Sequence, residues 1–294
     1  MGALRAGSIL AGFFVLTVPL MPVQALLIKL SPKAARRFPH WYHRQVCRLI
    51  GLHLEIEGEL VRDQPVLLVS NHTSWLDIPV LSAVAPVSFV AKTEVGTWPF
   101  VAALARLQRT VFVDRTRRQA AGEAAGEIMQ RLNAGDAIVL FAEGTSSDGN
   151  RVLPFKTSLF GAVKAGARAK SSIAPTAMVQ TVAVVYTRLH GIPLGRGGRP
   201  EVSWYGDMAM QSHAWQVLRS GPLQVAIRIG PPVPLGDFVD RKDLALKTER
   251  EVRQAVHRIL RARRAGEPLE PVEPADDQRA IALGGRALAG EKWT

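Results

Sequence analysis

A histidine and an aspartate stand five positions apart in a short polar stretch that is suited to acid–base chemistry. The stretch, Asn71–Asp77, directly follows the apolar run Val66–Ser70. If Ser74 caps a helix that begins at the next residue, the carboxylate of Asp77 can turn back to one ring nitrogen of His72. Such a contact fixes the imidazole tautomer and makes the other nitrogen a general base. The spacing of Ser74 and Asp77 is also that of an acidic capping box, so a purely structural role stays open for the pair alone.

A second polar stretch, Glu143–Gly149, follows the apolar run Ala137–Phe141. Its glycine, threonine and serine residues offer backbone N–H groups and hydroxyls that suit an anion. The stretch lacks the Gly-Lys-Ser/Thr of a Walker loop and the Gly-x-Ser-x-Gly of a serine hydrolase. An ordinary tight turn is the alternative at this position.

Arg115 follows a third apolar run, Thr110–Val113, within a cluster of charged residues. A guanidinium group at the end of a strand is a natural bidentate ligand for phosphate. The alternative is a solvated charge cluster that opens a helix, which is the commoner setting for any single arginine.

Apolar runs of strand length alternate with helix-like stretches over the middle of the chain. The runs predict strands over Val66–Ser70, Val87–Ala91, Thr110–Val113, Ala137–Phe141, Val179–Tyr186 and Val225–Ile229. The stretches predict helices over Ile78–Val84, Gln119–Asn133 and Leu159–Ala169, with Gly135 as the stop signal of the second. This alternation predicts an α/β fold in which helices flank a largely parallel sheet and functional residues gather beyond the strand ends.

The N-terminal segment differs from the rest of the chain because Ala6–Ile28 contains no charged residue. A helix of that length is about 35 Å long, enough to cross a membrane. Pro19 and Pro22 interrupt it, so a re-entrant or interfacial helical hairpin is as compatible with the sequence as a clean span. Removal of the segment at a signal-peptidase site near Ala25 is a further alternative, weakened because only Arg5 precedes the apolar run.

Basic residues follow the apolar segment without any acidic residue among them. They are Lys29, Lys33, Arg36, Arg37, Arg44 and Arg48. Cations beside an apolar segment stay on the cytoplasmic side and attract anionic headgroups. This predicts attachment to the inner (cytoplasmic) membrane with the catalytic domain on the cytoplasmic side. A basic helix over Arg241–Arg264 is expected to hold the same face on anionic lipid. An ordinary solvated basic helix is the alternative for the first set.

These patterns divide the chain into a membrane-attachment helical segment over 1–50, an α/β domain over 51–265 and a flexible tail over 266–294. The tail is rich in proline and acidic residues and shows no sustained apolar period. The 294 residues carry a net charge of +12, and 47% of them are hydrophobic, which excludes a wholly disordered chain. The single cysteine, Cys47, excludes an internal disulfide and a cysteine-cluster metal site.

Taken together, the three polar stretches resemble the glycerolipid acyltransferase family, which contains 1-acylglycerol-phosphate acyltransferase. The three motifs of that family correspond to Asn71-His72-x-x-x-x-Asp77, Phe112-Val113-Asp114-Arg115 and Phe141-x-Glu143-Gly144-Thr145. Residues 173–176 loosely resemble the fourth motif, and the likeness runs from Val66 to Pro234. Ser146 replaces a frequent arginine of the third motif, which leaves that motif one cation short.

The resemblance implies an O-acyltransferase that uses no metal and no cofactor. His72, oriented by Asp77, would take the proton of an acceptor hydroxyl as that oxygen attacks the thioester of acyl carrier protein or coenzyme A. The residues implied in substrate binding are Asn71, Arg115, Glu143, Gly144, Thr145 and Lys156. The first acceptor to consider is 1-acyl-sn-glycerol-3-phosphate, which would give phosphatidic acid. The variant run from Ser146 to Ser158 also resembles acyltransferases that acylate lyso-ornithine lipid.

Two other classes of function have weaker support in the sequence. A nucleic-acid-binding protein would fit the positive charge, but the sequence contains no zinc module, RNA-binding motif or DNA-reading helix. A membrane-associated hydrolase or metal-dependent enzyme built on His72 and Asp77 would need further ligands at helical or hairpin spacing, and the sequence offers none. The expected partners are the thioester donor, a lysolipid acceptor and an anionic membrane surface, with no nucleic acid among them.

Overall fold

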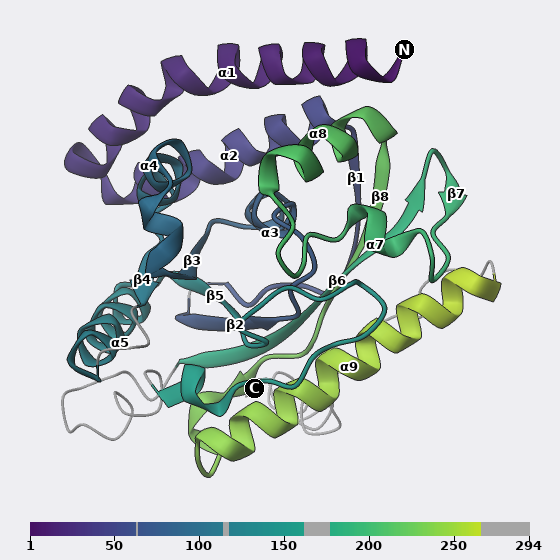
Figure 1. Ribbon diagram of the computed structural model, residues 1–294. Helices are drawn as coiled ribbons and strands as arrows, with labels where there is room; N and C mark the ends of the chain where they lie inside the picture. Colours follow the sequence, from purple (N-terminus) through teal and green to yellow (C-terminus); the bar gives the residue numbers. More distant parts are fainter. Residues whose placement is uncertain (63, 114–117, 162–176, 266–294) are drawn as a thin grey trace, which may run out of the picture.

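A computed structural model of the chain describes residues 1–62, 64–113, 118–161 and 177–265. In this part of the chain nine strands form one sheet with helices on both of its faces (Figure 1). The strands are β1 (Leu52–Glu57), β2 (Val66–Ser70), β3 (Val87–Lys92), β4 (Val111–Val113), β5 (Ala137–Phe141), β6 (Met178–Leu189), β7 (Ile192–Pro193), β8 (Leu223–Ile229) and β9 (Val233–Pro234). Their order is β1-β8-β6-β2-β5-β3-β4, with β7 and β9 paired to β6.

Parallel pairing dominates the sheet, as the alternation of strands and helices predicts. Strand β2 lies between β5 and β6 and runs parallel to both, and β3 runs parallel to β5 and β4. Strand β6 pairs antiparallel with β8, β7 and β9, while β8 runs parallel to the edge strand β1.

The six predicted strands are confirmed, and four of them are apolar runs that are mostly buried. All five residues of β2 are buried, as expected for a strand between two helical layers. The sequence did not predict β1, in which charged and apolar residues alternate at the edge of the sheet. The short strands β7 and β9 were also unexpected.

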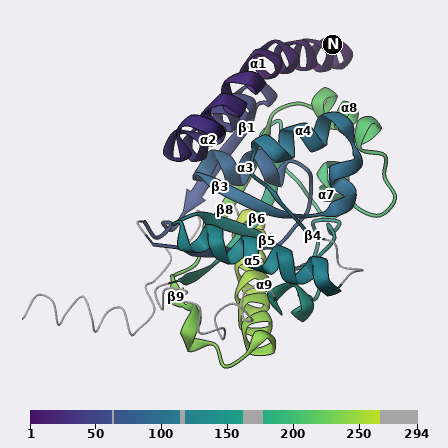
Figure 2. The same cartoon turned by 90° about the vertical axis from the view of Figure 1, so that its left-hand side faces the viewer.

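The helices form two layers (Figures 1 and 2). Helices α1, α2, α3 and α8 share an apolar core with one face of the sheet, and α5 and α9 share a second core with the other face. The bounds are α1 (Gly2–Leu30), α2 (Pro32–Ile50), α3 (Asp77–Val84), α4 (Pro99–Leu107), α5 (Arg118–Asn133), α7 (Arg199–Val202), α8 (Met210–Ser220) and α9 (Arg241–Ala265). Helix α5 ends before Gly135, whose φ of +80° suits glycine, so the predicted stop is confirmed.

Several predictions fall wholly or partly outside the described residues. The helix predicted over Leu159–Ala169 is described only at its start, where the 3-10 turn η2 covers Thr157–Phe160. The fourth motif at 173–176 and the tail over 266–294 are not described.

Helix α1 passes through both of its prolines instead of breaking at them. Pro19 and Pro22 lie inside the helix, which bends along its length, as helices do at proline (Figure 1). The chain turns later, at Ser31, whose side chain accepts the N–H of Ala34 and so caps α2. The hairpin is therefore made by α1 and α2, and does not lie within Ala6–Ile28.

Helix α1 packs along the domain and contacts α2, α8 and α4. Ala6 and Ile9 are buried, and the side-chain amide of Gln24 donates to the carbonyls of Ala35 and Leu107, both at 2.9 Å. Among the described helices, only α1 is long and apolar enough to cross a membrane, judged by length and composition. Its contacts with three helices favour a helix that lies along the domain.

The basic residues do not form one lipid-facing set. The guanidinium of Arg36 pairs with the buried carboxylate of Asp136 at 2.6 Å, and Arg109 pairs with the other oxygen at 2.7 Å. Arg36 therefore ties α2 to the residue before β5 and does not face lipid. Helix α9 lies on the opposite face of the sheet from α1 and α2 (Figure 2). The expectation that both basic segments hold one face on anionic lipid is therefore wrong.

Candidate active site

The loops that follow β2 and β5 emerge side by side. The two strands are parallel neighbours, and their last residues, Ser70 and Phe141, are paired in register. His72 and Glu143, 71 positions apart in the sequence, each stand two residues beyond these strand ends. The N–H of Ser147 donates to the carbonyl of His72 at 2.9 Å, so the first and third motifs meet.

The ring of His72 is held by two neighbours. Its Nδ1 lies 2.8 Å from Oδ2 of Asp77, and the ring stacks on Phe141 with the centroids 4.1 Å apart. Asp77 is fully buried, whereas 18% of the His72 side chain is exposed. Because a carboxylate oxygen accepts hydrogen bonds, the pair places the proton on Nδ1 and leaves Nε2 with the lone pair of a general base.

Asp77 also organises the turn that the sequence assigned to a Ser74 cap. Helix α3 begins at Asp77, whose carboxylate accepts the N–H groups of Thr73 (2.7 Å) and Ser74 (3.0 Å). The helix does not begin at Trp75, where a Ser74 cap would start it, because Trp75 and Leu76 form a turn. The observed bounds agree with the predicted helix Ile78–Val84 to within one residue. The two roles that the spacing left open thus occur in one side chain, which contacts His72 and caps the preceding turn.

Strand β6 fixes the first motif from the side away from β5. The side chain of Asn71 donates to the carbonyl of Val184 and accepts its N–H, both at 2.9 Å. The hydroxyl of Tyr186 donates to Oδ1 of Asp77 at 2.7 Å. The resemblance assigned Asn71 to substrate, but its buried amide is engaged by the backbone of β6. No motif or spacing singled out Tyr186, which is the last residue of the predicted strand Val179–Tyr186.

Glu143 links two loops. One carboxylate oxygen accepts the N–H of His72 and the other that of Leu153, both at 2.8 Å. Only 1% of the residue is exposed. Burial raises the pKa of Glu143 to about 7, although the two N–H donors act in the opposite direction. The resemblance assigned Glu143 to the acceptor; in the structure its carboxylate instead holds the backbone of His72.

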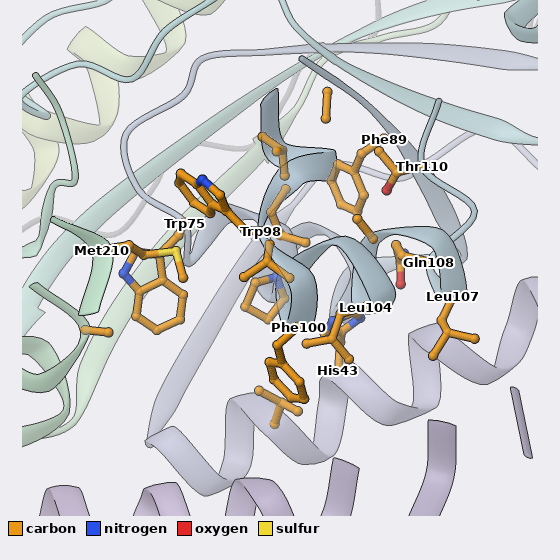
Figure 3. Close-up of a pocket in the computed structure, with 18 of the residues that line it drawn as sticks. His43, Trp75, Phe89, Trp98, Phe100, Leu104, Leu107, Gln108, Thr110 and Met210 are labelled. Carbon is orange, nitrogen blue, oxygen red and sulfur yellow. The ribbon is translucent and has the colours of Figure 1, made fainter. Parts of the chain in front are cut away.

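A large and mostly apolar cavity lies beside His72. It has a volume of about 670 Å³ and is bounded by α1, α2, α4, α8 and residues that follow β2, β3 and β5. Figure 3 shows Trp75, Trp98 and Met210 on one side of this space and Phe89 on the other. A cavity of this size and lining suits a long apolar ligand that reaches the ring of His72.

The remaining predicted binding residues are distributed unevenly. Gly144 and Thr145 line the cavity together with His72. Lys156 is exposed and does not belong to the lining. Arg115 lies outside the described residues, so its position relative to the cavity is not described.

Cys47 is not placed to act as a nucleophile. Its thiol is buried and donates to the carbonyl of Pro79 at 3.5 Å. Burial raises the pKa of Cys47 to about 12, and a thiol that keeps its proton is a poor nucleophile. Over the part of the chain that the structure describes, no group of three or more His, Cys, Asp or Glu residues could hold a metal ion.

The chain is similar to known proteins over most of its length. The family model described as Acyltransferase matches residues 53–179. A lyso-ornithine lipid O-acyltransferase from Brucella abortus is 49% identical over 266 residues, covering 90% of this chain and 99% of that protein. A 1-acyl-sn-glycerol-3-phosphate acyltransferase from Neisseria meningitidis is 31% identical over 216 residues, covering 72% of this chain and 78% of that protein.

A solved structure has the same fold. It is the crystal structure of the 1-acyl-sn-glycerophosphate acyltransferase from Thermotoga maritima, with a TM-score of 0.61 and 23% identity. The likeness covers 88% of this chain and 94% of that one. The predicted α/β class, with a largely parallel sheet and an apolar N-terminal helix, is confirmed.

Proposed function

Because the chain belongs to the acyltransferase family, we propose that it transfers a fatty acyl group from a thioester of acyl carrier protein or coenzyme A to the free hydroxyl of lyso-ornithine lipid. The O-acyltransferase activity is common to its relatives. The observation that carries the choice of acceptor is the high identity to the Brucella protein across nearly the whole of that protein. The identity to the Neisseria enzyme is lower and extends over a smaller part of both chains.

Ser146 supports lyso-ornithine lipid as the first acceptor, ahead of 1-acyl-sn-glycerol-3-phosphate. This order is the reverse of the one that the motifs indicated. It lines the cavity with His72, at the position where the family often carries an arginine. A phosphate head group is best held by such a bidentate cation. An ornithine head group carries both an ammonium and a carboxylate group, so it needs less positive charge around it.

The site geometry supports a direct transfer. Nε2 of His72 takes the proton of the acceptor hydroxyl while that oxygen attacks the thioester carbonyl. The C–O bond forms and the C–S bond breaks. The leaving thiolate takes the proton from His72 and departs as a thiol. A general base of this kind contributes about 10²–10⁴ in rate. With Cys47 buried as a thiol, the acyl group need not pass through the enzyme.

We further propose that the outer side of α1 contacts the cytoplasmic surface of the inner membrane. Leu4 and Val15 are more than 70% exposed, and Val18 and Leu26 are more than half exposed, while the opposite side of the helix packs on the domain. An apolar helix face with exposed basic residues nearby is typical of an interfacial helix. This placement opens the cavity beside α1 towards the lipids that supply the acceptor.

Replacing Val15 and Val18 together by glutamate should weaken binding to anionic phospholipid vesicles by at least about tenfold, because two apolar side chains are lost from the lipid contact. The measurement is co-sedimentation with vesicles. The matched control is the double replacement of Val239 and Leu246 by glutamate, since both are exposed beside or on α9, across the sheet. Equal loss in the two variants, or no loss in either, would contradict the lipid contact of α1.

An acceptor panel with purified enzyme tests the proposed reaction. We expect the wild type to acylate lyso-ornithine lipid with a kcat/KM at least about tenfold above that for 1-acyl-sn-glycerol-3-phosphate. Ser146→Arg should raise kcat/KM for the phosphate acceptor about tenfold relative to lyso-ornithine lipid, because it restores the missing cation. Transfer of a labelled acyl group to each acceptor measures both values.

The matched control is Ser146→Ala. It removes the hydrogen bond from Ser146 Oγ to the Trp204 carbonyl without adding charge, so the ratio between acceptors should stay as in the wild type. A wild-type preference for the phosphate acceptor would overturn the proposed acceptor. An unchanged ratio in Ser146→Arg would show that this position does not select the head group.

A further inference from the structure

The carboxylate of Asp77 makes four hydrogen bonds in a position with no solvent access. Oδ2 accepts from Nδ1 of His72 and from the N–H groups of Thr73 and Ser74. Oδ1 accepts from the hydroxyl of Tyr186 at 2.7 Å. Among the described residues, this hydroxyl is the single hydrogen-bond donor to Oδ1. Three bonds to one oxygen fix the place of that atom, but the bond to Oδ1 sets the rotation of the carboxylate about its own axis.

Tyr186 lies where it can hold this orientation rigidly. It is 3% exposed, lies in the second half of β6 and packs in the core shared with α2 and α3. Two residues earlier on the same strand, the backbone of Val184 holds the side chain of Asn71 by two hydrogen bonds. Strand β6 therefore fixes both ends of the first motif, through Asn71 at its start and Asp77 at its end.

The hydroxyl of Tyr186 stays a donor over the working pH range. Burial, and after it the negative charge of Asp77, raise the pKa of Tyr186 well above its usual value. A buried hydroxyl bonded to a carboxylate is also among the stronger hydrogen bonds of a protein. Tyr186 does not belong to the lining of the cavity, so it acts on the reaction only through Asp77.

We propose that Tyr186 is a positioning residue for acyl transfer, the third member of a chain Tyr186–Asp77–His72 that aims Nε2 of His72 at the acceptor hydroxyl. The proposal rests on the proposed role of His72 as the base, and it holds whichever lysolipid is the acceptor. A residue that orients the base without touching substrate should affect kcat and leave substrate binding unchanged.

Tyr186→Phe tests this role, because it removes one oxygen atom and keeps the ring that packs in the core. We expect kcat to fall about tenfold or more, with KM for donor and acceptor within twofold of the wild type. In a His72→Ala background the same change should have no further effect on the residual rate, since the base that Tyr186 positions is gone. The Nδ1 proton of His72, followed by NMR, should shift in Tyr186→Phe even without substrate.

Thr248→Val is the matched control, because it removes a buried hydroxyl from α9 on the other face of the sheet. A kcat near the wild type in Tyr186→Phe would overturn the proposal, and so would an equal loss in the presence and absence of His72. An unshifted Nδ1 proton would overturn it too. High activity of His72→Ala itself would instead overturn the proposed base, so the two failures are distinguishable.

Discussion

Replacing His72 by alanine is expected to lower acyl transfer by about 10²–10⁴ while the protein folds and binds membranes as before. The ring contributes Nε2, the nitrogen that does not contact Asp77, and it lines the cavity. Without it, the acceptor hydroxyl must attack with its proton in place. The fold is expected to survive because Asp77 keeps its hydrogen bonds from Thr73, Ser74 and Tyr186. Transfer of a labelled acyl group measures the loss, and the unfolding midpoint measures the stability.

The comparison for this variant is His53→Ala, which removes an exposed imidazole from the edge strand β1. It should leave the transfer rate within twofold of the wild type. A rate near the wild type in His72→Ala would contradict the role of the base. A collapse of the unfolding midpoint would show that the ring serves mainly to support the loop.

Much of the fold follows from local sequence because the central strands of the sheet are apolar runs that both helical layers bury. The bounds predicted for β2 and β5 match those observed. Their parallel pairing also makes the meeting of His72 with Gly144 and Thr145 predictable, since neighbouring parallel strands end together. The motifs thus carry enough information to predict which two loops meet beyond the ends of these strands.

The contacts that hold the site could not be predicted, because they join residues far apart in the chain. Tyr186 and Asp77 are 109 positions apart. Nothing in the run Val179–Tyr186 distinguishes a tyrosine whose hydroxyl binds Asp77 from one that only packs its ring in the core. Asn71 and Glu143 were assigned to substrate by resemblance alone. Only the positions of β6 and of Leu153 show that their side chains bind backbone groups.

The prediction for the N-terminal segment was wrong for a different physical reason. Local rules treat Pro19 and Pro22 as helix breakers, but packing against α2, α8 and α4 supports α1 across both of them. Arg36 was likewise placed at the lipid surface from charge pattern, whereas the buried Asp136 draws it into an ion pair. Tertiary contacts override the local preference in both cases.

Glu143 is under opposing demands from stability and function. Its pKa is about 7 in the folded protein against an ordinary value of 4.5, mainly because of burial. Asp77 raises the pKa further and Arg253 lowers it. A raised pKa means that the folded state binds the proton more tightly than the unfolded state. The resulting stability is therefore full below about pH 4.5 and is lost as the pH rises through 7. The ionised form, however, is the one whose two oxygens accept both N–H groups.

Glu143→Gln is expected to lower kcat by about 10² at neutral pH, because a misplaced base costs about that much. An amide has one acceptor oxygen, so its NH₂ group must face the N–H of either His72 or Leu153. The loop that carries His72 then shifts or loses a hydrogen bond. Steady-state kinetics measure the loss, and Glu127→Gln is the control, since that carboxylate is 44% exposed and pairs with Arg131 on the surface of α5.

The same variant should remove the pH dependence that Glu143 gives to folding. Between about pH 4.5 and 7 the wild type should lose on the order of 3 kcal/mol of unfolding free energy relative to Glu143→Gln, because only the wild type must bury an ionised carboxylate. Urea unfolding of both proteins at several pH values gives this difference. A constant difference across the range would contradict the raised pKa, even if the kinetic loss is found. If Glu143→Gln lowers kcat and stability in parallel at all pH values, Glu143 serves folding alone. Its position between two loops instead requires that the variant be less active and yet equally or more stable above pH 7.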